Sequence, residues 1–208
     1  MSSENNIPPR LILILGGARS GKSAFAERLA AGSGKTVAFI ATATSGDDEM
    51  RERITRHRAS RPQEWLTIEE PLDLAGALWQ AYKLADVAIL ECVTLWLSNI
   101  LLQQPGENGH EVQGNEEERI TSSLFDEQSM QHIEELIATI QNAQAGKTLI
   151  LVSNEVGLGI VPAYPLGRIY RDTLGYVNQR LARAADRVYL MVAGLAVDIK
   201  RLHQEAML

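Results

Sequence analysis

A glycine-rich turn between an apolar run and a helical pattern most constrains what this chain of 208 residues can fold into. The run Leu11–Leu15 is followed by GGARSGKS, which fits the pattern Gly-x-x-x-x-Gly-Lys-Ser from Gly16 to Ser23. The next residues, Lys22–Ala31, have a helical pattern, so the glycines lie where a buried strand turns into a helix. This order of strand, turn and helix is the P-loop arrangement, which holds the phosphates of a nucleotide.

The spacing assigns a role to each part of this turn. Glycines tolerate positive φ and close contact with a phosphate, so successive backbone N–H groups can form an anion-binding nest. We expect Lys22 to reach the β- and γ-phosphates and Ser23 to supply a hydroxyl to Mg²⁺. The residues expected to bind the nucleotide here are Gly16, Gly17, Ala18, Arg19, Ser20, Gly21, Lys22 and Ser23.

Alternating strand and helix patterns predict an α/β fold with a mostly parallel central sheet. The expected strands are Leu11–Leu15, Thr36–Ala41, Val87–Glu91, Thr148–Ser153 and Val188–Val192. The expected helices are Lys22–Ala31, Asp47–Arg58, Leu72–Leu84, Thr94–Leu102, Gln128–Asn142 and Leu166–Ala185. Right-handed crossovers place helices on both faces of such a sheet and ligand sites at the carboxyl ends of the strands. The length fits a single domain over residues 1–208.

Charge and cysteine content narrow the class of protein. The net charge of −6 is concentrated in residues 104–128, which hold seven acidic residues and one basic residue, leaving 19 of each elsewhere. We therefore expect no nucleic-acid partner, and we interpret 104–128 as an acidic, mobile insertion.

The single cysteine, Cys92, cannot form an internal disulfide, which is typical of a reducing compartment. Residues 1–10 are polar and expected to be flexible, and no apolar run is long enough to span a membrane, so we expect a cytoplasmic protein.

Polar residues interrupt the chain where later predicted strands end. The apolar run before Glu91 places this carboxylate to act on Mg²⁺ directly, through water, or as a base. The segment Asn154–Pro162, with its glycines and proline, is interpreted as a substrate-binding or switch loop, and its Glu155 is a second candidate base. Polar residues of the following helix are weaker candidates, because those on an amphipathic helix mostly face solvent. They are Arg168, Arg171, Asp172, Asn178 and Gln179.

One histidine lies among arginines in DDEMRERITRHRASRPQEW. Met50, Ile54 and His57 fall at i, i+4 and i+7, so periodicity alone favours a packed or surface histidine. Guanidinium groups nearby would instead stabilise a triphosphate and a departing pyrophosphate, and would keep the imidazole neutral and nucleophilic. This composition suggests nucleotidyl transfer through a covalent intermediate on His57, with Arg61 as a candidate nucleotide contact.

The motifs together resemble those of a known enzyme family. The segments LILGGARSGKSAFAE, ATATSGDDEMRERITRHRASRPQEW, AILECVTLWLSNIL, LVSNEVGLGIVP and RIYRDTLGYVNQRLARAADRVYLMVAG are similar to the bifunctional adenosylcobinamide kinase / adenosylcobinamide-phosphate guanylyltransferase family. The resemblance covers residues 11–200. It implies a RecA-like P-loop NTPase fold and commonly a homotrimer, with active sites between subunits.

The resemblance also implies two reactions and a role for one residue. The enzyme would phosphorylate the corrinoid adenosylcobinamide with ATP or GTP and then transfer GMP from GTP to that phosphate, and the position matching the guanylylated histidine is His57. Two features depart from the family pattern: position 56 is Arg where some relatives have a second histidine, and the 104–128 segment is longer and more polar than expected.

Two other functions are compatible with the residues. The first is a plain P-loop kinase for another small alcohol, in which His57 takes no part. The second is a nucleotide-sensing switch that binds GTP and moves the loop Asn154–Pro162 without transferring phosphate.

Overall fold

The computed structural model describes residues 10–44, 51–52, 55, 58–59, 61–102 and 115–207, without the side chains of 115–124. Its strands are β1 (Leu11–Gly16), β2 (Val37–Ala41), β3 (Leu66–Glu69), β4 (Val87–Glu91), β5 (Thr148–Val152), β6 (Arg187–Val192) and β7 (Leu195–Asp198). Its helices are α1 (Lys22–Gly32), α3 (Leu74–Leu84), α4 (Val93–Leu102), α5 (Asn115–Gln141), α6 (Pro165–Ala184) and α7 (Ile199–Ala206).

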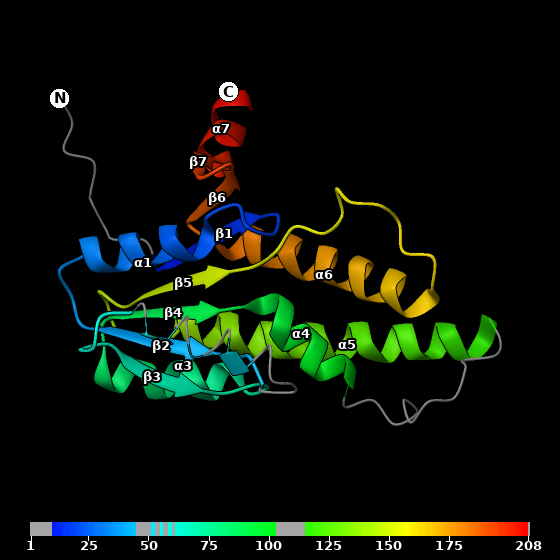
Figure 1. Ribbon diagram of the computed structural model, residues 1–208, viewed down its shortest axis with the longest axis horizontal. Helices are drawn as coiled ribbons and strands as arrows, with labels where there is room; N and C mark the ends of the chain where they lie inside the picture. Colours follow the sequence, from blue (N-terminus) through cyan, green and yellow to red (C-terminus); the bar gives the residue numbers. More distant parts are fainter. Residues whose placement is uncertain are drawn as a thin grey trace.

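The strands form one sheet in the order β3-β2-β4-β5-β1-β6-β7. Each neighbouring pair is parallel except β6 with β7, which are antiparallel. Helices cover both faces, and the end formed by β6, β7 and α7 rises from the body of the molecule (Figure 1). The predicted mostly parallel sheet with helices on both faces is confirmed.

The central strand β1 is buried along its whole length because both of its faces are covered. Its alternate residues point to opposite faces, as in any strand. Leu13 and Leu15 join a large apolar cluster with α3, α4, α5 and α6, whereas Ile12 and Ile14 join a second cluster with α1. This packing explains why the strand reads as a continuous apolar run rather than an alternating one.

The predicted elements agree with the structure at most of their ends. All five predicted strands are present and end within one residue of the expected positions. The predicted helices over α1, α3, α4 and α6 are also present. The helix predicted for Asp47–Arg58 falls mostly outside the described residues, and those described there, such as Arg51 and Thr55, are helical.

Helix α5 differs from the prediction, because it begins at Asn115 rather than at Gln128. The acidic segment is therefore helical, not a loop, from residue 115 onward; residues 103–114 lie outside the described part. Two contacts explain the longer helix. The side chain of Phe125 is completely buried, and the hydroxyl of Thr173 in α6 donates a hydrogen bond to Asp126. Three short elements, β3, β7 and α7, were not predicted from the sequence.

The burial of β1 gives a stability prediction. Leu13 is fully buried, so replacing Leu13 with Ala should lower the free energy of unfolding by about 2–5 kcal/mol through lost transfer energy and a residual cavity. The same change at Leu158, which is 87% exposed, should alter it by less than about 0.5 kcal/mol. Urea denaturation of both variants checks this, and equal losses would contradict the assigned packing.

Candidate functional site

The loop that follows β1 has the backbone geometry of a P-loop. Gly16 has φ of 151° and Gly21 has φ of 95°. A Cβ atom on Gly16 would lie 2.6 Å from the carbonyl oxygen of Met191, so no larger residue fits there without a shift. Gly21 is the N-cap of α1, and no side chain caps this helix. The first turn of α1 therefore presents backbone N–H groups, the arrangement that binds phosphate.

The turn between β6 and β7 supports this loop from the side. The backbone N–H of Gly194 donates a hydrogen bond of 3.0 Å to the carbonyl of Ser20. A Cβ on Gly21 would come within 3.3 Å of the Cα of Gly194, so the two backbones are in close contact. Arg19, at the tip of the loop, has a left-handed backbone with φ of 60°, a conformation that is uncommon for residues other than glycine. Nothing in the sequence pattern pointed to Gly194.

Lys22 lies across the same loop. Its Nζ donates a hydrogen bond of 2.7 Å to the carbonyl of Gly17, and the residue is buried. Burial lowers the pKa of the Lys22 ammonium, because desolvation disfavours its charged form, and the nearby carboxylate of Glu91 acts in the opposite direction. The cation is thus held at the phosphate loop, where the sequence predicts it.

Ser23 and Glu91 meet although they are far apart in the sequence. Ser23 is in the first turn of α1, Glu91 is the last residue of β4, and the Ser23 hydroxyl donates a hydrogen bond to Oε1 of Glu91. The peptide bond between Glu91 and Cys92 is cis. No group of three or more His, Cys, Asp and Glu side chains in the described residues is arranged to hold a metal. A hydroxyl and a carboxylate still suit Mg²⁺, which takes few protein ligands and completes its shell with water and phosphate oxygens.

Arg61 is placed beside this carboxylate. Its guanidinium carbon lies 3.2 Å from the centroid of the Phe39 ring on β2. Burial lowers the pKa of Arg61, and the charge of Glu91 acts against that effect. Arg58, in contrast, is exposed and pairs with Glu69 at 3.3 Å. The predicted contact Arg61 therefore lies near the predicted acid, whereas His57 and Arg56 lie outside the described residues.

The loop after β5 is anchored to the P-loop at its start. The backbone N–H of Glu155 donates to the carbonyl of Gly16 at 3.0 Å. The carboxylate of Glu155 accepts a hydrogen bond of 2.7 Å from the N–H of Gly157, so it is engaged within its own loop. Further along, Leu158 and Ile160 are 87% and 97% exposed. This geometry favours Glu91 over Glu155 as the acid of the phosphate site.

Among the polar residues of α6 named as candidates, Asn178 has a structural role at the end of β5. Its Nδ2 donates to the carbonyl of Asn154 at 3.0 Å, and its Oδ1 accepts from the hydroxyl of Ser153 at 2.7 Å. Arg168 donates to the carbonyl of Ala163 in the preceding loop, and Arg171 pairs with Asp172. Gln179 is exposed. Asn178 and Arg168 thus hold the loop after β5, whereas the Arg171–Asp172 pair lies within α6.

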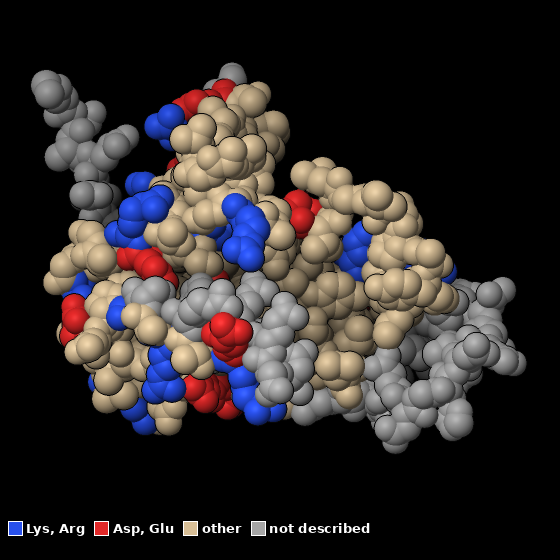
Figure 2. Space-filling view, viewed as in Figure 1, with Lys and Arg blue, Asp and Glu red and all other residues tan. Residues whose placement is uncertain are grey.

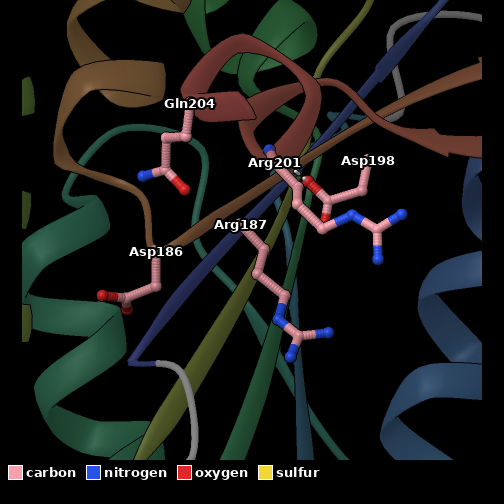
Figure 3. A pocket seen from close by; sticks show the side chains of 5 residues that line it. All are labelled: Asp186, Arg187, Asp198, Arg201 and Gln204. Carbon is pink, nitrogen blue, oxygen red and sulfur yellow. Dashed lines mark hydrogen bonds between the residues drawn. The ribbon is translucent and has the colours of Figure 1, made fainter. Parts of the chain in front are cut away.

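A separate polar pocket lies at the opposite end of the sheet (Figure 3). Its lining residues are Asp186, Arg187, Asp198, Arg201 and Gln204. Arg187 of β6 lies opposite Ile12 in the strand register, near the start of β1, whereas the P-loop follows the end of β1. Asp186 accepts hydrogen bonds from the N–H groups of Arg10 and Leu11, and Asp198 caps α7. The pocket is therefore part of the framework and not of the phosphate site.

Two surface properties bear on partners. On the face shown in Figure 2, acidic and basic residues are interspersed among the described residues. None of the described helices combines the length and apolar character needed to cross a membrane.

The sequence matches known proteins over most of its length. The family model described as cobinamide kinase / cobinamide phosphate guanyltransferase matches residues 12–199. The bifunctional adenosylcobalamin biosynthesis protein CobP of Pseudomonas aeruginosa is 43% identical over 188 residues, which are 90% of this chain and 96% of that protein. The corresponding protein CobU of Escherichia coli is 40% identical over 195 residues, covering 91% and 99%.

A solved structure supports the fold class. An ATPase from the type III secretion system of pathogenic bacteria aligns with a TM-score of 0.53 at 10% identity, over 93% of this chain. The chain spans 58% of that ATPase, and at this identity the likeness concerns the fold alone. The predicted α/β fold with its mostly parallel sheet is thus shared with that ATPase. With the family model matching nearly the whole chain, the protein belongs to the cobinamide kinase / cobinamide phosphate guanyltransferase family.

Proposed function

We propose that this protein phosphorylates adenosylcobinamide with ATP or GTP and then transfers GMP from GTP to the product, giving adenosyl-GDP-cobinamide and pyrophosphate. The observation that carries the proposal is the hydrogen bond from Ser23 to Glu91, which joins the P-loop helix to an acidic strand end. P-loop phosphotransferases need this combination of a hydroxyl and a carboxylate beside the phosphates. Membership of the family supplies the corrinoid as the phosphate acceptor.

In the kinase step, the P-loop holds the nucleotide. Backbone N–H groups of residues 16–23 contact the phosphates, and Lys22 exchanges the carbonyl of Gly17 for phosphate oxygens. Ser23 and Glu91 are the residues that would hold Mg²⁺, which neutralises charge on the phosphates when bound. Arg61 adds a second desolvated cation near Glu91. The hydroxyl of the corrinoid attacks the terminal phosphorus and gives its proton to a base, for which Glu91 is the candidate, while the bond to the nucleoside diphosphate breaks.

In the transferase step, we propose that His57 is the nucleophile. A neutral imidazole nitrogen attacks the α-phosphorus of GTP, pyrophosphate leaves, and the corrinoid phosphate then displaces the imidazole, so the histidine is regenerated. His57 is outside the described residues, and the support comes from its neighbours in sequence. Arg58 pairs with Glu69 at the end of β3, and Arg61 stacks on Phe39 of β2. Arg61 is thereby held at β2, next to the β4 strand of Glu91, and Arg58 is held at β3, one strand further out.

We also propose a homotrimer in the cytoplasm. Exposed apolar residues on β7 and α7, including Leu195 at 72% and Leu202 at 47%, supply a surface for a neighbouring copy. A location in the reducing cytoplasm suits a chain whose single cysteine is a buried thiol. The interspersed charges on the face shown in Figure 2 favour small-molecule substrates over nucleic acid.

The role of His57 can be tested by covalent labelling. After incubation with Mg²⁺ and GTP labelled at the α-phosphate, the denatured wild-type chain should retain label that is stable to alkali and lost in acid, as a phosphoramidate is. His57→Ala should retain no label but keep kinase turnover, because the P-loop is intact. Absence of label on a folded, GTP-binding wild type would contradict the guanylyl-histidine and favour a plain kinase or a nucleotide switch.

The choice between the two acids can be tested with matched variants. Glu91→Gln should lower the kinase kcat by at least about 100-fold, because it removes the charge beside the phosphates. Glu155→Gln should stay within about 3-fold of the wild type, because its carboxylate is engaged within its own loop. Steady-state assays with adenosylcobinamide and ATP measure both effects. A large loss for Glu155→Gln with a small one for Glu91→Gln would reverse the assignment.

The oligomeric state has its own measurement. Sedimentation equilibrium should give three times the chain mass of 22.9 kDa. Replacement of Leu195 with Asp should shift the population toward the single-chain mass, because it places a charge on the proposed contact surface. A wild type that sediments as a single chain at micromolar concentration would contradict the trimer.

A further inference from the structure

The backbone on either side of Glu91 is held by Thr42. The paired ladder of β2 and β4 reaches Ala41 and Glu91, the last residues of the two strands. Thr42 extends it by one residue, because its N–H donates a hydrogen bond of 3.1 Å to the carbonyl of Glu91. The neighbouring strand therefore fixes the main chain at the point where the acidic side chain leaves the sheet.

The side chain of Thr42 holds the next residue as well. Its Oγ1 donates to the carbonyl of Cys92 and accepts from the N–H of Cys92, each at 2.8 Å. Thr42 is completely buried, and Cys92 is 9% exposed. One hydroxyl thus satisfies both polar backbone groups of Cys92 in a place that water does not reach. Removal of this hydroxyl would leave the buried N–H of Cys92 unpaired, which is costly, whereas the Cys92 carbonyl would keep the hydrogen bond of 3.1 Å from the N–H of Trp96.

Thr42 is itself fixed by a residue of α4. The Nδ2 of Asn99 donates to the carbonyl of Thr42 at 2.8 Å and to the carbonyl of Pro71 at 3.1 Å. This amide joins the exit of β2 to the connection between β3 and α3. The N–H, hydroxyl and carbonyl of Thr42 are therefore all engaged, and the residue has little freedom to move.

The junction between β4 and α4 is also held on the side away from Thr42. The hydroxyl of Thr94 in the first turn of α4 accepts from the N–H of Asn154 at 2.9 Å, and its carbonyl accepts from the hydroxyl of Tyr170 at 2.8 Å. Burial raises the pKa of Tyr170 to about 12, so it stays a donor at neutral pH. The junction of β4 and α4 is thus held between β2 and β5, with Glu91 at its start.

We propose that Thr42 is a positioning residue for Glu91 in the kinase step. This inference rests on the proposed function, in which Glu91 acts at the phosphates. Thr42 reaches the reaction only through the backbone of residues 91 and 92, whose placement sets the direction of the carboxylate toward Ser23. Displacement of a catalytic group by about 1 Å is enough to slow an enzyme about 100-fold. Nucleotide binding, which depends on the P-loop, should not respond.

The test compares two substitutions at Thr42 with a matched threonine elsewhere. With adenosylcobinamide and ATP as substrates, Thr42→Val should lower kcat by about 10- to 100-fold with the KM for ATP changed by less than about 2-fold. Thr42→Ser, which keeps the hydroxyl, should stay within about 3-fold of the wild type. Thr173→Val is the control: Thr173 is 1% exposed, and its hydroxyl binds Asp126 between α6 and α5. It should lower the melting temperature but leave kcat unchanged.

Several outcomes would overturn the role of Thr42: a Thr42→Val enzyme with kcat within 2-fold of the wild type, no recovery in Thr42→Ser, or an equal loss of kcat in Thr173→Val. If Thr42→Val does not fold, Asn99→Ala decides, because it removes the amide that holds the carbonyls of Thr42 and Pro71 and leaves the Thr42 side chain in place. Lowered kcat at unchanged KM in that variant supports the proposal, and unchanged kcat overturns it. A folded wild type without kinase turnover would instead overturn the proposed function.

Discussion

The phosphate site depends on the position of β1 between two parallel neighbours. Hydrogen bonds to β5 on one side and β6 on the other fix the point where the chain leaves the sheet at Gly16. Both neighbours then continue to hold the loop. Glu155, after β5, donates to the carbonyl of Gly16, and Gly194, after β6, donates to the carbonyl of Ser20. The loop is therefore preorganised by backbone contacts to both neighbouring strands and by the hydrogen bond from Lys22 to the carbonyl of Gly17.

The electrostatics of the site follow from this placement. Lys22 and Arg61 are both partly desolvated, and burial lowers the pKa of each. The negative charge of Glu91 acts against this lowering of the pKa at both Lys22 and Arg61. At Arg61, Glu27 is a second carboxylate that acts in the same direction as Glu91. A nucleoside triphosphate bound here would interact with the desolvated cations more strongly than with solvated ones.

The sequence predicts those parts of the structure that have a motif with fixed residue spacing or a hydrophobic pattern that repeats over many residues. The P-loop follows from invariant positions within eight residues, and Glu91 follows from the end of an apolar run. The short elements β3, β7 and α7 lack enough residues to show a period. The start of α5 was missed because a single buried aromatic, Phe125, anchors an otherwise acidic stretch. The roles of Thr42 and Asn99 could not be predicted because their partners are backbone atoms that are distant in the sequence. The Thr42 hydroxyl binds Cys92, 50 residues away, and the Asn99 amide binds the carbonyls of Thr42 and Pro71, 57 and 28 residues away.

The arrangement of the arginines bears on how one chain performs two reactions. Arg58 contacts Glu69 on β3 and Arg61 contacts Phe39 on β2, while Ser23 and Glu91 bridge α1 and β4. Strands β3, β2 and β4 are consecutive in the sheet, and their carboxyl ends lie on the edge that carries the P-loop. A nucleotide bound at this edge would lie close both to the two arginines and to the Ser23–Glu91 pair. For the two reactions that the family performs, one nucleotide site at this edge would therefore require less rearrangement than two separate sites.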